Sequence, residues 1–313
     1  MHLCDCKDAR ALTFLVPSQH LRKQQNPTFG GQLQLSQCRE MRARLPRYCR
    51  ETCQYRHMPM EDDGFEPPEA CVHWCQARTY DLHILDDGAS VDLDWWNSHL
   101  RDSGHEIQLR GRNDDGKIVT AGLATVQRND LRLGSELVSA THDGLGLLFL
   151  CAAWQSAHRD RRFKRRFPDV FGAPATKGDD PLQAIKSILD YCLKTRTLPA
   201  IHRGTWSGWP VTPGVGVSLL VAFMWAAEVS EAGSRAQLID QFGVSTLIHE
   251  GWLEDPSVSS FTLRRYHRYN QLLSSWATSA QTRPELIEMW LIKRWNARVQ
   301  EARHGERTMP TLF

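Results

Sequence analysis

The sequence predicts a mainly helical α+β protein in which a small sheet precedes a helical domain. Apolar residues recur at helical spacing from about Gly144 onward, whereas the preceding stretch shows the patterns of β-strands and tight turns. Cysteines are concentrated ahead of both, with seven of the nine before residue 76. These changes divide the chain into a Cys-rich region over residues 1–78, a small β-containing region over 79–140 and a helical domain over 141–313.

The β-containing region is expected to form a hairpin. Residues 106–109 and 118–126 have β character, and the turn Asn113–Gly116 lies between them. An Asp-Gly step favours the tight turns that join antiparallel strands. A small antiparallel sheet is therefore expected ahead of the helices.

Two helices are expected at the start of the helical domain and four after them. The apolar spacing from Leu147 to Trp154 indicates the first helix, and the second follows Asp180 and Pro181, which favour a helix start. Further helices are expected over residues 217–229, 238–250, 260–278 and 284–302.

The composition is that of an ordinary globular protein. The 313 residues are 41% hydrophobic and 24% charged, and the formal net charge of +2 is too small to identify a nucleic-acid-binding protein by itself. The N-terminus lacks the basic leader and apolar core of a secretion signal. The longest mostly apolar run, residues 217–229, is shorter than the roughly 20 residues that span a bilayer. We therefore expect a cytoplasmic protein with no membrane partner.

Two Cys-x-x-x-Cys pairs in the Cys-rich region leave two interpretations open. In the first, Cys49, Cys53, Cys71 and Cys75 hold a zinc ion, whose role would be structural because a closed four-ligand site leaves no place for water. In the second, the thiols are distributed through a small helical unit without metal. Both are more common than disulfide bonds in a reducing compartment.

A glycine-containing turn precedes the apolar helix expected over 217–229. Pro213–Gly216 reads Pro-Gly-Val-Gly, and Gly214 and Gly216 let the backbone turn tightly and approach another molecule closely. The unpaired backbone N–H groups at the start of the following helix, which includes Ser218, suit a phosphate. An ordinary connection between a loop and a helix could have the same sequence.

One acid, Asp240, follows the apolar pair Leu238-Ile239 at the expected start of the next helix. Aspartate is a preferred N-cap residue, which would account for its position without any chemistry. A catalytic carboxylate could occupy the same position, and the two roles are compatible.

Together, the turn, the apolar helix and the apolar-apolar-Asp-x-x-x-Val segment resemble the hairpin and catalytic region of helix-hairpin-helix DNA glycosylases. More particularly, the chain resembles the bacterial branch with an 8-oxoguanine DNA glycosylase (OGG) fold. Ala152–Ala157 is similar to the early helix of that branch, and Arg264–Tyr269 with Trp276 is similar to its late tyrosine-rich helix. The resemblance covers about Gly144 to Trp295.

The resemblance implies a helix-hairpin-helix glycosylase-like domain that binds double-stranded DNA containing a modified base and hydrolyses its N-glycosidic bond, with Asp240 as the catalytic acid. Members that also cleave the strand use a lysine amine in the helix after the hairpin. The matching positions here are Ser218 in one register and Ala222 in the other, and no lysine occurs between Lys194 and Lys293. We therefore expect a monofunctional glycosylase without lyase activity, acting as a monomer and requiring no cofactor for catalysis.

Two groups of basic residues are expected to contact backbone phosphates. The run Arg159–Arg166 has six basic residues in eight positions, and a second group lies in the helix expected over 260–278. A charge run is more often only a solvated face. The expected DNA contacts are Gly214, Gly216, Ser218, Arg159, Arg161, Arg162, Lys164, Arg165, Arg166, Arg264, Arg265 and Arg268.

An extruded base would be held between aromatic or apolar side chains. Most of the 11 tryptophans should belong to the core, but Trp206 and Trp209 lie in a Gly/Pro-rich loop before the turn. The expected base pocket consists of Trp206, Trp209, Trp154 and Gln155.

Two other functions stay open at this point. A non-catalytic DNA-binding protein of the same fold would keep the turn and the basic residues without using a pocket around Asp240. An acyl-transfer enzyme with a Cys or Ser nucleophile and a histidine is a third alternative, although no nucleophile motif is present. The sequence does not identify the base, which ranges from oxidised or mispaired purines, in DNA repair, to hypermodified bases in phage DNA, in phage defence.

Overall fold

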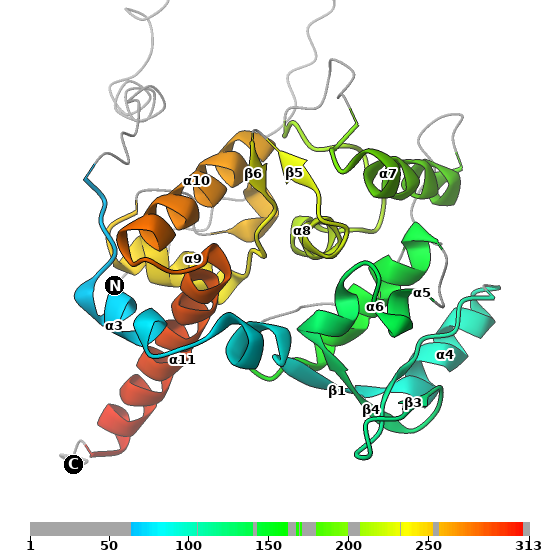
Figure 1. The fold of residues 1–313 in the computed structure, drawn as a ribbon, viewed down its shortest axis with the longest axis horizontal. Coiled ribbons are helices and arrows are strands. Elements are labelled where there is room, and N and C mark those ends of the chain that lie inside the picture. The colour runs from blue at the N-terminus through cyan, green and yellow to red at the C-terminus, as the bar shows by residue number, and fades with distance from the viewer. Residues whose placement is uncertain are drawn as a thin grey trace, which may run out of the picture. The chain divides into compact units, whose positions relative to one another are not determined.

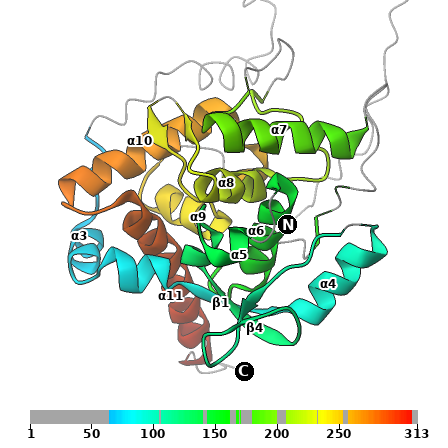
Figure 2. The same ribbon diagram turned by 45° about the vertical axis from the view of Figure 1, so that its right-hand side comes forward.

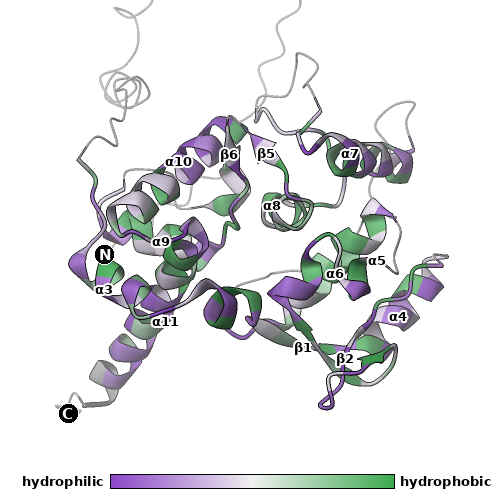
Figure 3. Ribbon diagram, in the orientation of Figure 1, coloured by the Kyte–Doolittle hydropathy of each residue, from purple (hydrophilic) through white to green (hydrophobic). Residues whose placement is uncertain are grey.

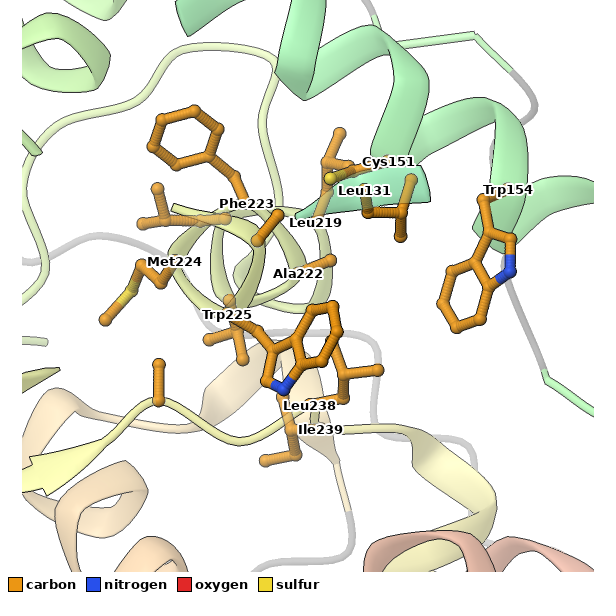
Figure 4. Packing of buried hydrophobic residues seen from close by; sticks show 14 of the residues in the cluster. Leu131, Cys151, Trp154, Leu219, Ala222, Phe223, Met224, Trp225, Leu238 and Ile239 are labelled. Carbon is orange, nitrogen blue, oxygen red and sulfur yellow. The ribbon is translucent and has the colours of Figure 1, made fainter. Parts of the chain in front are cut away.

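Two apolar helices form the centre of the fold. α6 (Gly144–Ala157) is buried from Gly144 to Gln155, and α8 (Val217–Ala226) is buried from Leu219 to Ala226. A helix that is hydrophobic on all sides has to be enclosed by other elements. The two helices pack against each other, and Figure 4 shows α8 surrounded by buried apolar side chains.

The computed structural model describes residues 64–104, 106–139, 143–161, 167–168, 170, 180–199, 207–231, 233–252 and 257–308. All of them belong to one unit of the chain, Met60–Phe313. Figure 1 shows the order of their helices and strands by colour. Most of the expected Cys-rich region, residues 1–63, lies outside the described residues.

All six expected helices are present, with bounds that differ from the expected ones by a few residues. Asp180 caps α7 by accepting a hydrogen bond of 3.1 Å from the Leu182 N–H, as its position before Pro181 predicted. Besides α6 and α8, these helices are α7 (Pro181–Thr195), α9 (Gln241–His249), α10 (Leu263–Ser279) and α11 (Pro284–Thr308). The shorter elements are α3 (Glu69–Gln76), η1 (Asp81–Leu85), α4 (Leu93–Asp102), η2 (Arg128–Leu131), α5 (Glu136–Ser139), η3 (Val258–Ser260), β5 (Ser230–Glu231) and β6 (Ser234–Arg235).

A four-stranded antiparallel sheet in the order β1-β4-β2-β3 packs against α6 through β1. Buried and exposed residues alternate along β1 and β4, so one face of the sheet lies in the core. In the register of this pair, Ala89 lies opposite Val126. The strands are β1 (Gly88–Asp92), β2 (Gly111–Arg112), β3 (Ile118–Val119) and β4 (Leu123–Gln127).

The expected hairpin is formed by β2 and β3. Asn113 closes the turn by accepting a hydrogen bond of 2.9 Å at Oδ1 from the Lys117 N–H. The expected strand 118–126 is two strands, separated by Gly122 at φ +75°, a conformation that favours glycine. Residues 106–109, which were expected to be a strand, are irregular and do not pair with the sheet.

The side chain of Asn97 on α4 explains the irregular segment. Its Oδ1 accepts a hydrogen bond of 2.7 Å from the Leu109 N–H, and its Nδ2 donates one of 3.1 Å to the Leu109 carbonyl. A buried backbone needs a partner for each polar group. Here a helix side chain supplies both partners in place of a neighbouring strand.

The helices of the C-terminal part pack mainly against one another. α8 lies near the middle of the described elements in both views (Figures 1 and 2). α11 packs against α9, α10 and α3. Figure 3 shows that α6 and α8 are mostly hydrophobic, whereas the C-terminal part of α11 is hydrophilic. Among the described residues, no helix is long and apolar enough to cross a membrane.

A buried ionic cluster joins three separate segments. Glu288 of α11 is 1% exposed at its side chain and contacts Arg128 of η2 at 3.0 Å. Its carboxylate also pairs with both terminal nitrogens of Arg161, just beyond α6, at 2.7 and 3.2 Å. Each guanidinium also lies over a core indole, Arg128 over Trp225 at 4.4 Å and Arg161 over Trp154 at 4.9 Å.

The charges in this cluster stabilise one another. Burial opposes the charge of Arg161, but the carboxylates of Glu288 and Asp87 raise the pKa of Arg161 above its ordinary value. Burial also disfavours an ionised Asp87, yet the hydrogen bond with His158, at 2.8 Å, and the charge of Arg161 lower the pKa of Asp87. The cluster therefore has the charge balance that a buried ionic group requires.

Replacing Glu288 should test how strongly the fold depends on this cluster. Glu288→Gln removes the charge that compensates two buried guanidinium groups, and we expect the free energy of unfolding to fall by roughly 3–5 kcal/mol. Glu285→Gln is the matched control, because Glu285 is also buried on α11 but faces the half-exposed Arg283 at 3.8 Å. The control should lose about 1 kcal/mol or less. Equal losses of the two variants in urea unfolding would contradict the role given to Glu288.

Candidate functional site

The turn before α8 has the geometry that its sequence predicts. The Val215 N–H donates a hydrogen bond of 3.0 Å to the Thr212 carbonyl, which closes a four-residue turn. Pro213 is the second residue of this turn, and Gly214 is the third with φ +75°. Proline followed by a residue of positive φ is the pattern of a type II turn. A side chain at Gly214 would strain this conformation.

Gly216 is the N-cap of α8 and leaves the helix end open. Glycine has no side chain with which to cap the helix, and Gly216 has φ −78°, an ordinary value for any residue. A Cβ atom added to Gly216 would meet nothing within 4 Å. The N–H groups of a first helical turn lack partners within the helix and attract anions. The start of α8 is therefore a candidate position for an anion.

The loop ahead of this turn is attached to the start of α10. The Leu263 N–H donates a hydrogen bond of 2.8 Å to the Ser207 carbonyl, and Trp209 Nε1 donates one of 2.8 Å to the Phe261 carbonyl. Arg264, which is exposed, lies in the first turn of α10. The open end of α8 and an exposed cation thus belong to one connected region.

Asp240 lies beside the start of α8. It is the N-cap of α9, is 7% exposed, and accepts a hydrogen bond of 2.8 Å from the Phe242 N–H. The preceding residue, Ile239, accepts a hydrogen bond of 3.1 Å at its carbonyl from the Ser218 hydroxyl. The first turn of α8 is therefore bonded directly to the residue before the acid.

Gln155 of α6 reaches the same turn of α8. Its Nε2 donates a hydrogen bond of 3.2 Å to the Ser218 carbonyl. Because that partner can only accept, the amide nitrogen must face it and Oε1 must face away. The Oε1 atom is buried and has no hydrogen-bond partner among the described residues. A buried acceptor without a partner is costly and marks a place for a donor.

The two tryptophans of the expected pocket that the structure describes belong to the core. Trp154 is fully buried and donates from Nε1 to the Asp87 carbonyl at 3.1 Å. Trp209 is 6% exposed, and its ring lies 5.3 Å from that of Tyr266. Trp206 lies outside the described residues. Of the expected pocket, Gln155 is the member that the structure brings next to Ser218.

The basic residues have different environments. Arg159 is 88% exposed at its side chain, as expected of a phosphate contact. Arg161 was expected to contact phosphate at the surface, but its side chain is 4% exposed and pairs with Glu288 in the core. Arg265 and Arg268 are half-buried. The members of the run that lie outside the described residues are Arg162, Lys164, Arg165 and Arg166.

Cys71 and Cys75 lie one turn apart on α3 with both side chains in the core. A hydrogen bond with Cys75, together with burial, raises the pKa of the Cys71 thiol. Cys49 and Cys53 lie outside the described residues. Within the part of the chain that the structure describes, no group of three or more His, Cys, Asp and Glu side chains could hold a metal ion. A four-cysteine zinc site therefore stays a prediction.

The structure also contains a cavity of about 610 Å³ that the sequence did not reveal. Its charged walls come from segments far apart in the chain, so only the folded structure brings them together. Several of these charged side chains pair with a neighbour in the wall, such as Asp160 with Lys293 and Asp87 with His158. The lining residues are Trp74, Arg78, Leu82, His83, Asp86, Asp87, Gly88, His158, Arg159, Asp160, Met289 and Lys293.

Comparison with known families places the site in context. A family model described as "Putative 8-oxoguanine DNA glycosylase OGG-like protein" matches residues 82–292. The matched range contains Gln155, Gly216, Ser218, Asp240 and Glu288. No curated protein and no solved structure matches the chain.

Proposed function

Because the chain belongs to the family described as "Putative 8-oxoguanine DNA glycosylase OGG-like protein", we propose that it is a monofunctional DNA glycosylase that hydrolyses the N-glycosidic bond of a damaged or modified base in double-stranded DNA. One observation supports this proposal above the others. Ser218, in the first turn of α8, accepts a hydrogen bond from Gln155 and donates one to the carbonyl of the residue before Asp240. In the proposed site the start of α8 is the phosphate contact, Gln155 is the base contact and Asp240 is the acid.

In the proposed reaction the bond between C1′ of the sugar and the base nitrogen breaks, and the base departs with the electron pair. Positive charge develops on the sugar, and the Asp240 carboxylate stabilises it. Water adds to C1′, and Asp240 accepts its proton, which then passes to the departing base. The products are a free base with an N–H group and an abasic sugar in an intact strand.

The position of Ser218 supports a route without a covalent amine intermediate. Ala222, the alternative match to the family lysine, is fully buried among apolar side chains (Figure 4). Ser218 is half-buried and bonded to the residue before Asp240. Its hydroxyl is no source of a Schiff base, and the sequence has no lysine between Lys194 and Lys293.

The free Oε1 of Gln155 favours a base that presents an N–H donor. A donor would satisfy an acceptor that is otherwise buried without a partner, whereas an acceptor in the same place would be repelled. Oxidised purines and hypermodified bases of phage DNA both include members with such groups, and in the second case the enzyme would act in phage defence. We propose Trp206, which precedes Ser207 in the sequence and lies outside the described residues, as a stacking partner.

DNA binding is proposed to use the turn, the start of α8 and the exposed basic residues, with the enzyme acting as a monomer in the cytoplasm. Gly214 and Gly216 allow close approach of a phosphate, and Arg264 and Arg159 add exposed charge. Arg162, Lys164, Arg165 and Arg166 are proposed to extend this surface. A non-catalytic DNA-binding protein would use the same contacts, but it would have no need of a catalytic acid at Asp240.

Gly216→Asp should separate DNA binding from folding. Its Cβ would enter open space and aspartate is a better N-cap than glycine, so the free energy of unfolding should stay within about 1 kcal/mol. The new carboxylate would repel a phosphate at the start of α8, and we expect affinity for a duplex to fall at least about tenfold. Gly216→Asn, which has the same size and capping ability without the charge, should bind more tightly than Gly216→Asp in fluorescence anisotropy. Equal affinities of these two variants would show that no phosphate lies there.

Asp240→Asn should abolish base release while preserving the fold. Asparagine also caps helices, so stability and DNA affinity should change little, whereas the rate of base release should fall by roughly 100-fold or more. Asp180→Asn is the matched control, because Asp180 caps α7 in the same way but lies outside the proposed site. Single-turnover kinetics with retained activity in Asp240→Asn would place the chemistry elsewhere.

The wild-type product should be an intact strand with an abasic site. We expect the strand to break only after hot alkali, and borohydride should trap no covalent complex, since no amine is placed to form a Schiff base. Denaturing gel electrophoresis with and without alkali distinguishes the two routes. A trapped complex would demonstrate an amine nucleophile and overturn the monofunctional assignment.

A further inference from the structure

The three peptide carbonyls immediately before Asp240 each accept a hydrogen bond from a side-chain hydroxyl. The pairs are Tyr266 Oη with the Gln237 carbonyl at 2.9 Å, Tyr269 Oη with the Leu238 carbonyl at 2.9 Å, and Ser218 Oγ with the Ile239 carbonyl at 3.1 Å. The Gln237 N–H also donates to Tyr266 Oη at 3.0 Å. All three carbonyls, those of residues 237–239, are therefore hydrogen-bonded to side chains of other elements.

These hydroxyls replace a neighbouring strand. Residues 236–240 follow β6 and precede α9, and they belong to no helix or strand. Extended backbone usually fixes its position by pairing with another strand. Here two tyrosines of α10 and a serine of α8 provide the partners, so the position of Asp240 depends on those two helices.

The two tyrosine hydroxyls are reliable donors. Both side chains are fully buried, and burial raises the pKa of Tyr266 and of Tyr269 well above the usual tyrosine value. Both hydroxyls are therefore protonated, and able to donate, at neutral pH. The rings also pack against Trp209 and Trp252, so removing a hydroxyl should leave the ring in place.

We propose that Tyr266 and Tyr269 are positioning residues for Asp240. They hold the segment before the acid at a fixed place relative to α10 and α8, whose ends form the proposed phosphate-binding region. A displacement of about 1 Å at a reacting group is enough to cost a large factor in rate. This inference rests on the proposed glycosylase function, because it assigns the tyrosines to the acid of that site.

Tyr269→Phe and Tyr266→Phe test the proposal, with Thr246→Val as the matched control. Thr246 is fully buried on α9 and donates from its hydroxyl to the Leu291 carbonyl at 2.7 Å, away from residues 236–240. All three variants remove one buried hydroxyl that donates to a backbone carbonyl. A difference in rate between the tyrosine variants and Thr246→Val therefore reports the position of the lost hydrogen bond, next to Asp240, rather than the loss of a buried hydrogen bond in general.

Two measurements are needed, the single-turnover rate of base release and hydrogen exchange of the peptide spanning residues 236–244. In Tyr269→Phe and Tyr266→Phe we expect the rate to fall at least about tenfold, with duplex affinity unchanged within about twofold and with faster exchange in this peptide. Thr246→Val should keep the wild-type rate. Tyrosine variants that keep the wild-type rate would overturn the proposal, whatever their hydrogen exchange.

Failure of the proposed function would give a different result. If the wild-type protein releases no base from any duplex, the glycosylase assignment fails, but hydrogen exchange still decides whether the hydroxyls hold the segment. If the wild type is active and the tyrosine variants are equally active, only the positioning role is refuted.

Discussion

The pairing of one buried carboxylate, that of Glu288, with two buried guanidinium groups is the interaction on which the rest of the structure depends. Glu288 belongs to α11, Arg128 to the short helix after the sheet, and Arg161 to the segment after α6. Because each charge would be strongly unfavourable alone in the core, the three segments have to meet in this arrangement. The cluster extends toward the site, since Asp240 adds to the carboxylates that raise the pKa of Arg161 against the opposing effect of burial.

The candidate site is constructed where four helices meet. α6 contributes Gln155, α8 contributes its open N-terminus and Ser218, α9 begins at Asp240, and α10 holds the segment before it. Each of these polar groups belongs to a helix or to a segment that is hydrogen-bonded to a helix. A site held in this way has little freedom to rearrange, which suits a reaction that stabilises charge at one atom.

The local features of the fold and the site could be predicted from the sequence, whereas the long-range pairings could not. Helical spacing, the Pro-Gly turn and the capping position of Asp240 depend on residues close together in the chain. The sequence predicted that Arg161 contacts phosphate at the surface, because it belongs to a run of basic residues. Its partner Glu288 lies far along the sequence, and only the folded chain brings the two side chains together in the core. Trp209 was expected in a base pocket because its loop is rich in Gly and Pro. The loop packs against the start of α10 instead, and this long-range contact is not visible in the sequence. The catalytic role of Asp240 is still a prediction.

The most direct test of the central claim, that this protein hydrolyses N-glycosidic bonds, is mass spectrometry of the bases released from a panel of duplexes. The panel should include oxidised purines, mispaired purines and the hypermodified bases of phage DNA, with an unmodified duplex of the same sequence as the reference. The expected result is a free base from at least one modified duplex, in an amount equal to the abasic sites formed, and none from the reference. Tight binding to a modified duplex with no free base from any member of the panel would contradict the claim and would identify a DNA-binding protein without this chemistry.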